Sequence, residues 1–320
     1  MSAPAATRST MQAVVVDTRT RQRLVIKEVP RPEPKPTEML VKAHAVSLNR
    51  GEIRTALEQA TDGWRPGWDV AGIVERAAAA TSGPPVGSRV VCSSGSAGWA
   101  EYVAIAPAAA ALIPDAVSFE QAAALPVAGL TARRGLQLGT PLQGTKVLVS
   151  GASGGVGTFA LQLARLQEAQ VVAALRTNAH AELAHQLGAD EVGVGDDLAG
   201  AQPYAPYDLI LESVGGPSLA SALGMLAPGG ICVLLGASAG SQTSFDAAKF
   251  RVGGTSLYGL VMGYEFQREP PGIGLAELVA LVATGKLHPH ISVTGRLSEV
   301  ADVAERLMQR GFAGKAVLTV

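Results

Sequence analysis

The glycine-rich stretch at residues 150–157, SGASGGVG, is the part of the chain whose residue types and spacing most directly indicate chemistry. Residues 145–149 before it are short and β-branched, which is typical of a buried parallel strand. After it, Phe159, Leu163 and Leu166 recur at the spacing of one helix face. A strand, a glycine turn and a helix in this order can hold a pyrophosphate through backbone N–H groups and the positive helix end. The stretch therefore predicts a dinucleotide site.

The residues that follow the second expected strand decide between the two nicotinamide cofactors. A site for NADH generally places Asp or Glu about twenty residues beyond the glycines, where the carboxylate binds the ribose 2′-OH. Here that position holds Arg176 and Thr177. Because an arginine pairs with a 2′-phosphate and a carboxylate does not, the sequence predicts NADPH. The alternative is that Arg176 is a solvated residue at a helix start.

The same glycine spacing also fits the turn of short-chain dehydrogenases, G-x-x-x-G-x-G. That family places the turn near its N-terminus and needs a Tyr-x-x-x-Lys pair for catalysis. No tyrosine in this chain has a lysine four residues later, and the turn lies near the middle. The sequence therefore favours a different dinucleotide-binding family.

Alternating strands and helices must position the glycine turn. We expect strands at 146–150, 170–175, 191–192, 207–211 and 230–235, and helices at 155–168, 179–187 and 217–226. This alternation predicts a parallel sheet covered on both faces, with ligand at the carboxyl ends of the strands. Residues 257–262 are expected to add an edge strand.

The first 110 residues show a different pattern, mostly β with irregular loops, which indicates a small barrel. We expect a hairpin of residues 11–16 and 23–29, followed by strands at 39–48, 70–75 and 88–92. Helices are expected at 118–125, 127–138 and 275–284. The final piece consists of a strand at 291–293, a helix at 298–310 and a strand at 315–320. We expect this piece to pack back on the barrel, which makes the first domain discontinuous.

Composition excludes several function classes. A chain of 320 residues is longer than one hydrophobic core usually supports, and its formal net charge of −1 gives no reason to bind nucleic acid or an anionic membrane. No apolar segment is long enough to be a membrane span. Residues 1–10 lack the apolar core of a secretory signal and are expected to form a loose tail. The two cysteines, Cys92 and Cys232, lie in apolar runs and are expected to be buried.

Over nearly its whole length the chain resembles the medium-chain dehydrogenase/reductases, in the zinc-free quinone oxidoreductase and enoyl reductase branch. The resemblance rests on six blocks: 66–72 (PGWDVAG), 124–132 (ALPVAGLTA), the glycine turn, 187–190 (LGAD), 212–216 (ESVGG) and 314–318 (GKAVL). It implies an α/β fold with a GroES-like β-barrel catalytic domain, residues 1–121 and 266–320. It also implies a Rossmann NADP-binding domain, residues 122–265.

The zinc enzymes of this superfamily carry a ligand cysteine and a Gly-His-Glu motif. By resemblance, the corresponding positions here are Asn49 and residues 67–69, Gly-Trp-Asp. Neither an amide nor an indole replaces a thiolate and an imidazole, and the four-cysteine structural lobe is missing. The comparison therefore predicts an enzyme without a metal, in which alcohol oxidation through a Lewis acid is disfavoured.

The resemblance implies hydride transfer from the nicotinamide C4 to a quinone or to the β-carbon of an α,β-unsaturated carbonyl compound. It places Asn49 and Thr131 by the nicotinamide end, and the alternative for Asn49 is a plain turn residue. The other implied cofactor contacts are Ser153, Gly154, Gly155, Val156, Arg176, Thr177, His180 and Gly236. Two positions depart from the family. Arg54 stands where many quinone reductases have a tyrosine. It is either a residue that binds an acidic or carbonyl substrate or a solvent-facing residue. His180 stands where the family has a lysine.

Two other functions stay open at this point. One is a non-catalytic NADPH-binding protein, which the missing tyrosine motivates, and the other is a secondary alcohol dehydrogenase. The expected partner is a small-molecule substrate that the sequence does not identify. An exposed edge strand at 257–262 would suit a homodimer. The expected location is the cytoplasm.

Overall fold

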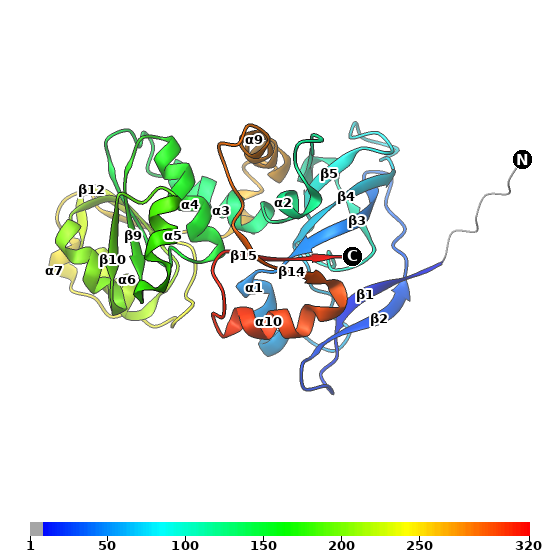
Figure 1. Cartoon of the computed structure of the whole chain (residues 1–320), viewed down its shortest axis with the longest axis horizontal. Coiled ribbons are helices and arrows are strands. Elements are labelled where there is room, and N and C mark those ends of the chain that lie inside the picture. Colours follow the sequence, from blue (N-terminus) through cyan, green and yellow to red (C-terminus); the bar gives the residue numbers. More distant parts are fainter. Residues whose placement is uncertain (1–8) are drawn as a thin grey trace, which may run out of the picture. The chain divides into compact units, whose positions relative to one another are not determined.

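The structure, a computed structural model, describes residues 9–320, so the predicted tail lies almost entirely outside the described residues. The described chain forms two compact units, which Figure 1 shows in the colours of the sequence. Unit 1 holds the described residues up to Val127 together with Glu269–Ala283 and Ile291–Val320. Unit 2 holds Ala128–Arg268 and Thr284–His290.

Unit 1 is built on a seven-stranded sheet in the order β14-β15-β3-β4-β5-β7, with β6 also paired to β3. Its strands are β3 (Met39–Ser47), β4 (Asp69–Arg76), β5 (Arg89–Ser93), β6 (Tyr102–Ile105), β7 (Ala110–Leu112), β14 (Ile291–Arg296) and β15 (Lys315–Thr319). The last strand, β15, runs antiparallel to β3 and parallel to β14. The end of the chain thus completes a sheet that the N-terminal third begins.

A hairpin and several short helices surround this sheet. The hairpin pairs β1 (Thr10–Val16) with β2 (Leu24–Pro30) in antiparallel register. The helices are α1 (Arg50–Arg54), a π-helix (Thr55–Gln59), α2 (Phe119–Ala123), α9 (Pro271–Ala283) and α10 (Val300–Met308), with 3₁₀ turns at Pro107–Ala109 and Leu297–Glu299.

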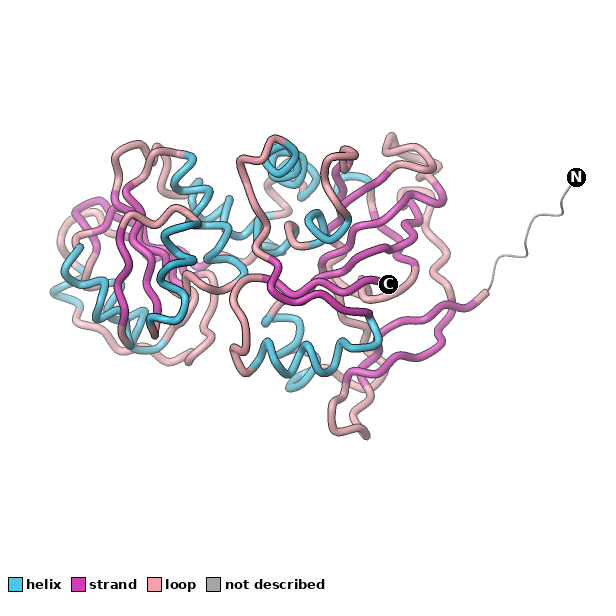
Figure 2. The backbone as a smooth tube through the Cα atoms, viewed as in Figure 1, coloured by secondary structure: helices cyan, strands magenta, loops and turns pink. Residues whose placement is uncertain are grey.

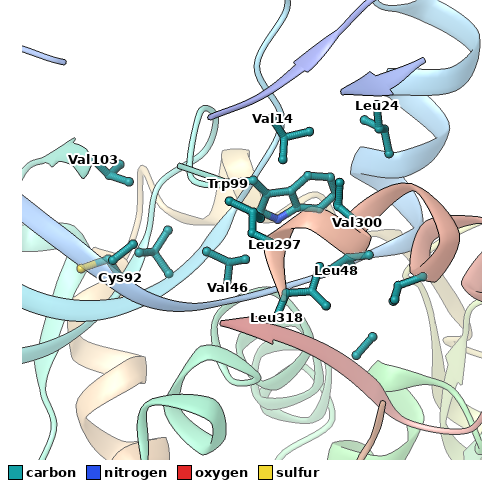
Figure 3. Close-up of a cluster of buried hydrophobic side chains, with 14 of the residues drawn as sticks. Val14, Leu24, Val46, Leu48, Cys92, Trp99, Val103, Leu297, Val300 and Leu318 are labelled. Atoms are coloured by element: carbon teal, nitrogen blue, oxygen red, sulfur yellow. The ribbon is translucent and has the colours of Figure 1, made fainter. Parts of the chain in front are cut away.

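Trp99 lies at the centre of the unit 1 core. Figure 3 shows its indole among aliphatic side chains from the hairpin, from β3 and from the C-terminal segment. Its Nε1 donates to the carbonyl oxygen of Ser47 at 3.1 Å, so the buried N–H has a partner. Cys92 belongs to the same core, and burial raises the pKa of its thiol. Both cysteines are free and buried, as predicted.

Unit 2 contains a six-stranded, fully parallel sheet in the order β10-β9-β8-β11-β12-β13. The strands are β8 (Lys146–Val149), β9 (Gln170–Leu175), β10 (Glu191–Val194), β11 (Tyr207–Glu212), β12 (Leu226–Leu234) and β13 (Ser256–Gly259). The strands β8, β9 and β11 are almost continuously buried, which is expected for a parallel sheet with helices on both faces. Figure 2 shows these strands with helices around them.

Helices connect the strands of unit 2 and cover the sheet. They are α3 (Pro126–Gln137), which begins at the unit boundary, α4 (Gly155–Leu166), α5 (Ala181–Gln186), α6 (Gly216–Leu223), α7 (Ala247–Phe250) and α8 (Met262–Glu265), with 3₁₀ segments at Asn178–His180 and Asp196–Tyr204. None of the helices in the described part of the chain combines the length and the apolar character that crossing a bilayer requires.

The predicted α/β fold class, with a β-rich unit and a parallel Rossmann-like sheet, is confirmed. Several short elements were not predicted, among them β6, β7, α1, the π-helix, α7 and α8. The strands β6 and β7 are only four and three residues long, so they show little periodicity. The expected strand at 39–48 matches β3 to within one residue, and the helix α1 that Asn49 caps follows it where no helix was expected.

Candidate active site

The glycine-rich loop joins the carboxyl end of β8 to the start of α4. Gly151 has a φ of +57°, in the left-handed region that favours glycine. A Cβ atom on Gly157 would lie 2.5 Å from the carbonyl oxygen of Gly151, so only glycine lets the first turn of α4 pack on the loop. Gly154 caps the helix, and its N–H donates to the Gly151 carbonyl at 2.9 Å. The first N–H groups of α4 have no partner within the helix and can bind an anion.

The strand order places this loop where a ligand is expected. The chain winds outward from β8 through β9 to β10, then returns to β11 on the other side of β8. The carboxyl ends of β8 and β11 therefore lie at the switch point of the sheet, where doubly wound folds bind dinucleotides.

Glu212, the last residue of β11, ties together the two strands at this switch point. Its buried carboxylate accepts hydrogen bonds from the hydroxyls of Ser150 at 2.9 Å and Ser218 at 2.8 Å, and from the N–H of Gly215 at 2.8 Å. The Ser150 hydroxyl in turn accepts from the N–H of Ser213 at 2.8 Å. These bonds hold the residue before the glycine loop against the loop that follows β11.

The structure brings most of the predicted cofactor residues of unit 2 to this edge of the sheet. Arg176 and Thr177 are exposed directly after β9, the parallel neighbour of β8. Gly236 follows β12, at the same edge. His180 is half-buried in a 3₁₀ turn, and Thr131 is buried within α3. The remaining predicted contacts, Ser153, Gly154, Gly155 and Val156, form the glycine loop and the first turn of α4.

Asn49, the predicted nicotinamide residue of unit 1, lies in a cluster of buried polar side chains. The amide Nδ2 donates to Glu52 Oε1 at 3.0 Å and to Asp69 Oδ2 at 2.8 Å. The amide Oδ1 accepts from Lys315 Nζ at 2.6 Å. Arg54, at the end of the same helix α1, is exposed and takes no part in this cluster.

The cluster brings two carboxylates and one ammonium together out of water. Glu52 and Asp69 are fully buried and Lys315 is 2% exposed. Lys315 Nζ lies 3.3 Å from Asp69 Oδ2 and donates to the carbonyl oxygen of Leu48 at 3.0 Å. Asp69 also accepts from the hydroxyl of Ser47 at 2.6 Å. Lys315 and Asp69 therefore have their charge and hydrogen-bond partners without any contribution from Glu52.

Burial and a neighbouring negative charge both favour the protonated form of Glu52. Burial, and then the neighbouring charge of Asp69, raise the pKa of Glu52 well above its ordinary value, against the opposing charge of Lys315. Its Oε1 accepts from the backbone N–H of Asn49 at 2.8 Å, whereas its Oε2 is buried without a hydrogen-bond partner. A neutral Glu52 leaves the cluster with no net charge, because the charges of Lys315 and Asp69 cancel.

Comparison with known proteins assigns the chain to a family. Family profiles match residues 155–278 as "Zinc-binding dehydrogenase" and residues 35–115 as "Alcohol dehydrogenase GroES-like domain". The quinone oxidoreductase of Homo sapiens is 30% identical over 305 residues, which cover 90% of this chain and 90% of the human protein. The chain belongs to the medium-chain dehydrogenase/reductases, in the quinone oxidoreductase branch.

Solved structures of this branch have the same fold. The quinone oxidoreductase from Coxiella burnetii has a TM-score of 0.84 and 27% identity, over 97% of this chain and 99% of its own. A mycobacterial relative solved in complex with NADPH has a TM-score of 0.86 and 26% identity, over 97% of this chain and 100% of its own.

The side chains of the present chain do not fit the zinc ion that the description of one family profile names. The residues that by resemblance correspond to the ligand cysteine and histidine are Asn49, both of whose amide hydrogens bond to carboxyl groups, and Trp68. The centre of the cluster is occupied by the ammonium of Lys315. Within residues 9–320, no three side chains of His, Cys, Asp or Glu gather closely enough to hold a metal ion.

Several residues of the site were not predicted from the sequence. Glu212 and Lys315 were noted only as members of family blocks, and Ser150 and Glu52 were given no role. A carboxylate that ends an apolar strand, such as Glu212, is a usable signal, because a buried charge needs partners. Lys315 gives no such signal, since its main partner Asn49 lies 266 residues earlier.

Proposed function

We propose that the protein is an NADPH-dependent, zinc-independent reductase that transfers hydride to a quinone or to the C=C bond of an α,β-unsaturated carbonyl compound. The observation that carries this proposal is the glycine loop at the switch point with Arg176 on the neighbouring strand end. The relative solved with NADPH supports the choice of cofactor.

The residues of unit 2 would hold the cofactor in the following way. The N–H groups of the loop and first turn, Ser153 to Val156, would bind the pyrophosphate. Arg176, with Thr177 and His180, would bind the adenosine 2′-phosphate through charge-assisted hydrogen bonds. Gly236 would border the cofactor at the end of β12. By family resemblance, Asn49 and Thr131 would meet the nicotinamide end.

Bound NADPH would supply a hydride, that is two electrons and one proton, and a second proton from the medium completes the reduction of the acceptor. The task of the chain is then to orient the acceptor and to stabilise the oxygen that gains negative charge. Asn49 has no free hydrogen for this purpose, since both amide hydrogens bond to Glu52 and Asp69. We assign the donor role to the exposed guanidinium of Arg54.

The proposal of zinc independence is supported by Lys315, whose ammonium supplies a positive charge where zinc enzymes bind their metal. The Lys315 ammonium is buried and already bonded to Leu48, Asn49 and Asp69, so it is not available to lower the pKa of an alcohol. Reduction of an electron-poor acceptor has no such requirement.

The test is stopped-flow oxidation of NADPH against a panel of quinones, enones and enoyl thioesters, with metal analysis of the same sample. We expect at least one acceptor class to accelerate NADPH oxidation in a protein that contains no stoichiometric zinc. Tight NADPH binding with no oxidation by any panel member would instead identify a non-catalytic NADPH binder. Stoichiometric zinc together with oxidation of secondary alcohols would identify an alcohol dehydrogenase.

We further propose that the protein acts in the cytoplasm as a homodimer. The strand β13 is the last strand of its sheet, and it and the following residues carry exposed apolar side chains, namely Leu257, Val261 and Tyr264. An open edge with apolar neighbours is a template for pairing with a second copy.

A further inference from the structure

Arg65 is a half-buried arginine of unit 1 whose side chain has no partner within residues 9–320. The other half-buried arginines in the described part of this unit each donate to a carboxylate or to a backbone carbonyl oxygen. They are Arg23, Arg31, Arg50 and Arg89. Removing a charged group from water without a partner costs free energy. Arg65 therefore lowers the stability of the free protein, which the other four arginines do not.

The atoms of the Arg65 guanidinium differ in their exposure. Nε is buried without a hydrogen-bond partner. The two Nη groups also have no partner but are not buried, so they reach the surface of the molecule. Burial alone lowers the pKa of Arg65, and no neighbouring charge contributes. The guanidinium is thus a partly shielded cation that lacks a counter-charge.

The loop that lies against Arg65 adds hydrogen-bond donors and no negative charge. In this loop, residues 94–97 (Ser-Gly-Ser-Ala), the Ala97 N–H and the Ser96 hydroxyl donate to the Arg65 carbonyl oxygen at 2.9 and 3.0 Å. The backbone N–H groups of Gly95 and Ser96 have no partner in the described chain, and both residues are exposed. A Cβ atom on Gly95 would have no heavy atom within 4 Å, so there is room for a ligand at this loop.

The chemistry of these groups fits one class of ligand. A guanidinium presents its N–H groups as a planar fork that matches the oxygens of a carboxylate or a phosphate, and partial shielding from water strengthens such a pair. We propose that Arg65 is the binding residue of an anion site on unit 1, which takes a small molecule that carries a carboxylate or a phosphate group. The site goes beyond the proposed function, because it requires neither the cofactor nor turnover.

The first measurement compares the thermal unfolding of Arg65→Met and Arg50→Met in chloride buffer. Both variants replace a half-buried arginine of unit 1 by an apolar side chain, but Arg50 donates to the carbonyl oxygens of Leu307 and Met308 at 3.0 and 3.1 Å. We expect Arg50→Met to melt about 2–4 °C below the wild type. Arg65→Met should melt at or above the wild-type temperature, because it removes a charge that has no partner. A decrease like that of Arg50→Met, or failure of Arg65→Met to fold, would overturn the proposal.

The second measurement replaces chloride by inorganic phosphate or by acetate at constant ionic strength. Phosphate stabilises folded proteins in general by exclusion from their surface, so Arg65→Met supplies the baseline. We expect at least one of the two anions to raise the melting temperature of the wild type and of Arg50→Met by more than that of Arg65→Met, since a ligand stabilises the state that binds it. Equal increases in the wild type and Arg65→Met for both anions would refute the site.

The third measurement distinguishes an acceptor substrate from a free anion as the source of the bound group. It compares the reduction by NADPH of β-acetylacrylate, an enone with a carboxylate, and of its neutral methyl ester. If the acceptor supplies the group, Arg65→Met should raise KM for the acid roughly 5- to 30-fold and leave KM for the ester unchanged. Without such a selective increase, the anion response of the second measurement assigns the site to a free carboxylate or phosphate. Only this third measurement rests on the proposed function, so a wild type that reduces neither compound leaves the first two to decide the proposal.

Discussion

Replacement of Arg176 by alanine tests the cofactor assignment most directly. Arg176 is exposed at the carboxyl end of β9, so a bond from its guanidinium to a 2′-phosphate would form close to water. In that setting a charge-assisted hydrogen bond contributes less than it does in a buried site, and we expect a loss of about 1–2 kcal/mol. This corresponds to NADPH binding that is weaker by roughly 5- to 30-fold.

NADH lacks the 2′-phosphate, so its binding to Arg176→Ala should be unchanged. The measurement is the dissociation constant of each cofactor, by quenching of protein fluorescence or by calorimetry. Arg251→Ala is the control, because it removes another exposed arginine of unit 2 that lies beyond α7. It should leave both constants unchanged.

Ionic strength provides an independent readout of the same contact. The preference of the wild type for NADPH over NADH should decrease as salt is raised from about 0.01 to 1 M, because the screening length falls from about 30 to 3 Å. In Arg176→Ala this dependence should be much smaller. Equal losses of NADPH and NADH affinity in Arg176→Ala would refute the assignment of the phosphate site.

Three further substitutions test the loop, the buried cluster and the sheet edge. Gly157→Ala places a Cβ atom 2.5 Å from the carbonyl oxygen of Gly151, so we expect about 1–3 kcal/mol lower stability in urea unfolding and weaker binding of NADPH and NADH alike. Glu52 has a folded-state pKa above its ordinary value near 4.5, so its stabilising effect is full below that value and is lost as the pH rises through the folded-state pKa. The melting temperature of Glu52→Gln should therefore fall less than that of the wild type as the pH is raised from about 4.5 upward, and parallel curves would contradict this. Val261→Lys should convert a dimer to a monomer in light scattering, whereas Val86→Lys, at a similar exposure of 63% against 66%, should not.

Local sequence patterns determined most of the nucleotide-binding unit. The apolar run before residue 150, the glycine spacing and the helical period after it each depend on neighbours in the chain, so they could be recognised without the fold. The same holds for Arg176, whose place follows from counting residues beyond the glycines. The helix α1 also had a local signal, since Asn49 followed by Glu52 is a capping pair, but five residues are too few to show a helical period.

Only the tertiary structure decided how Asn49 can act. From the sequence, Asn49 was by resemblance a residue beside the nicotinamide or else a plain turn residue, and Lys315 was part of a terminal strand. The sheet brings β15 against β3 and so places the Lys315 ammonium on the amide oxygen, while Glu52 and Asp69 take the amide hydrogens. Contacts between residues so far apart follow from strand order and burial, because removal from water forces each buried polar group to find a partner. Residue types and spacing thus determined which cofactor and which chemistry to expect, and the packing of the sheet decided which groups bond to the amide of Asn49.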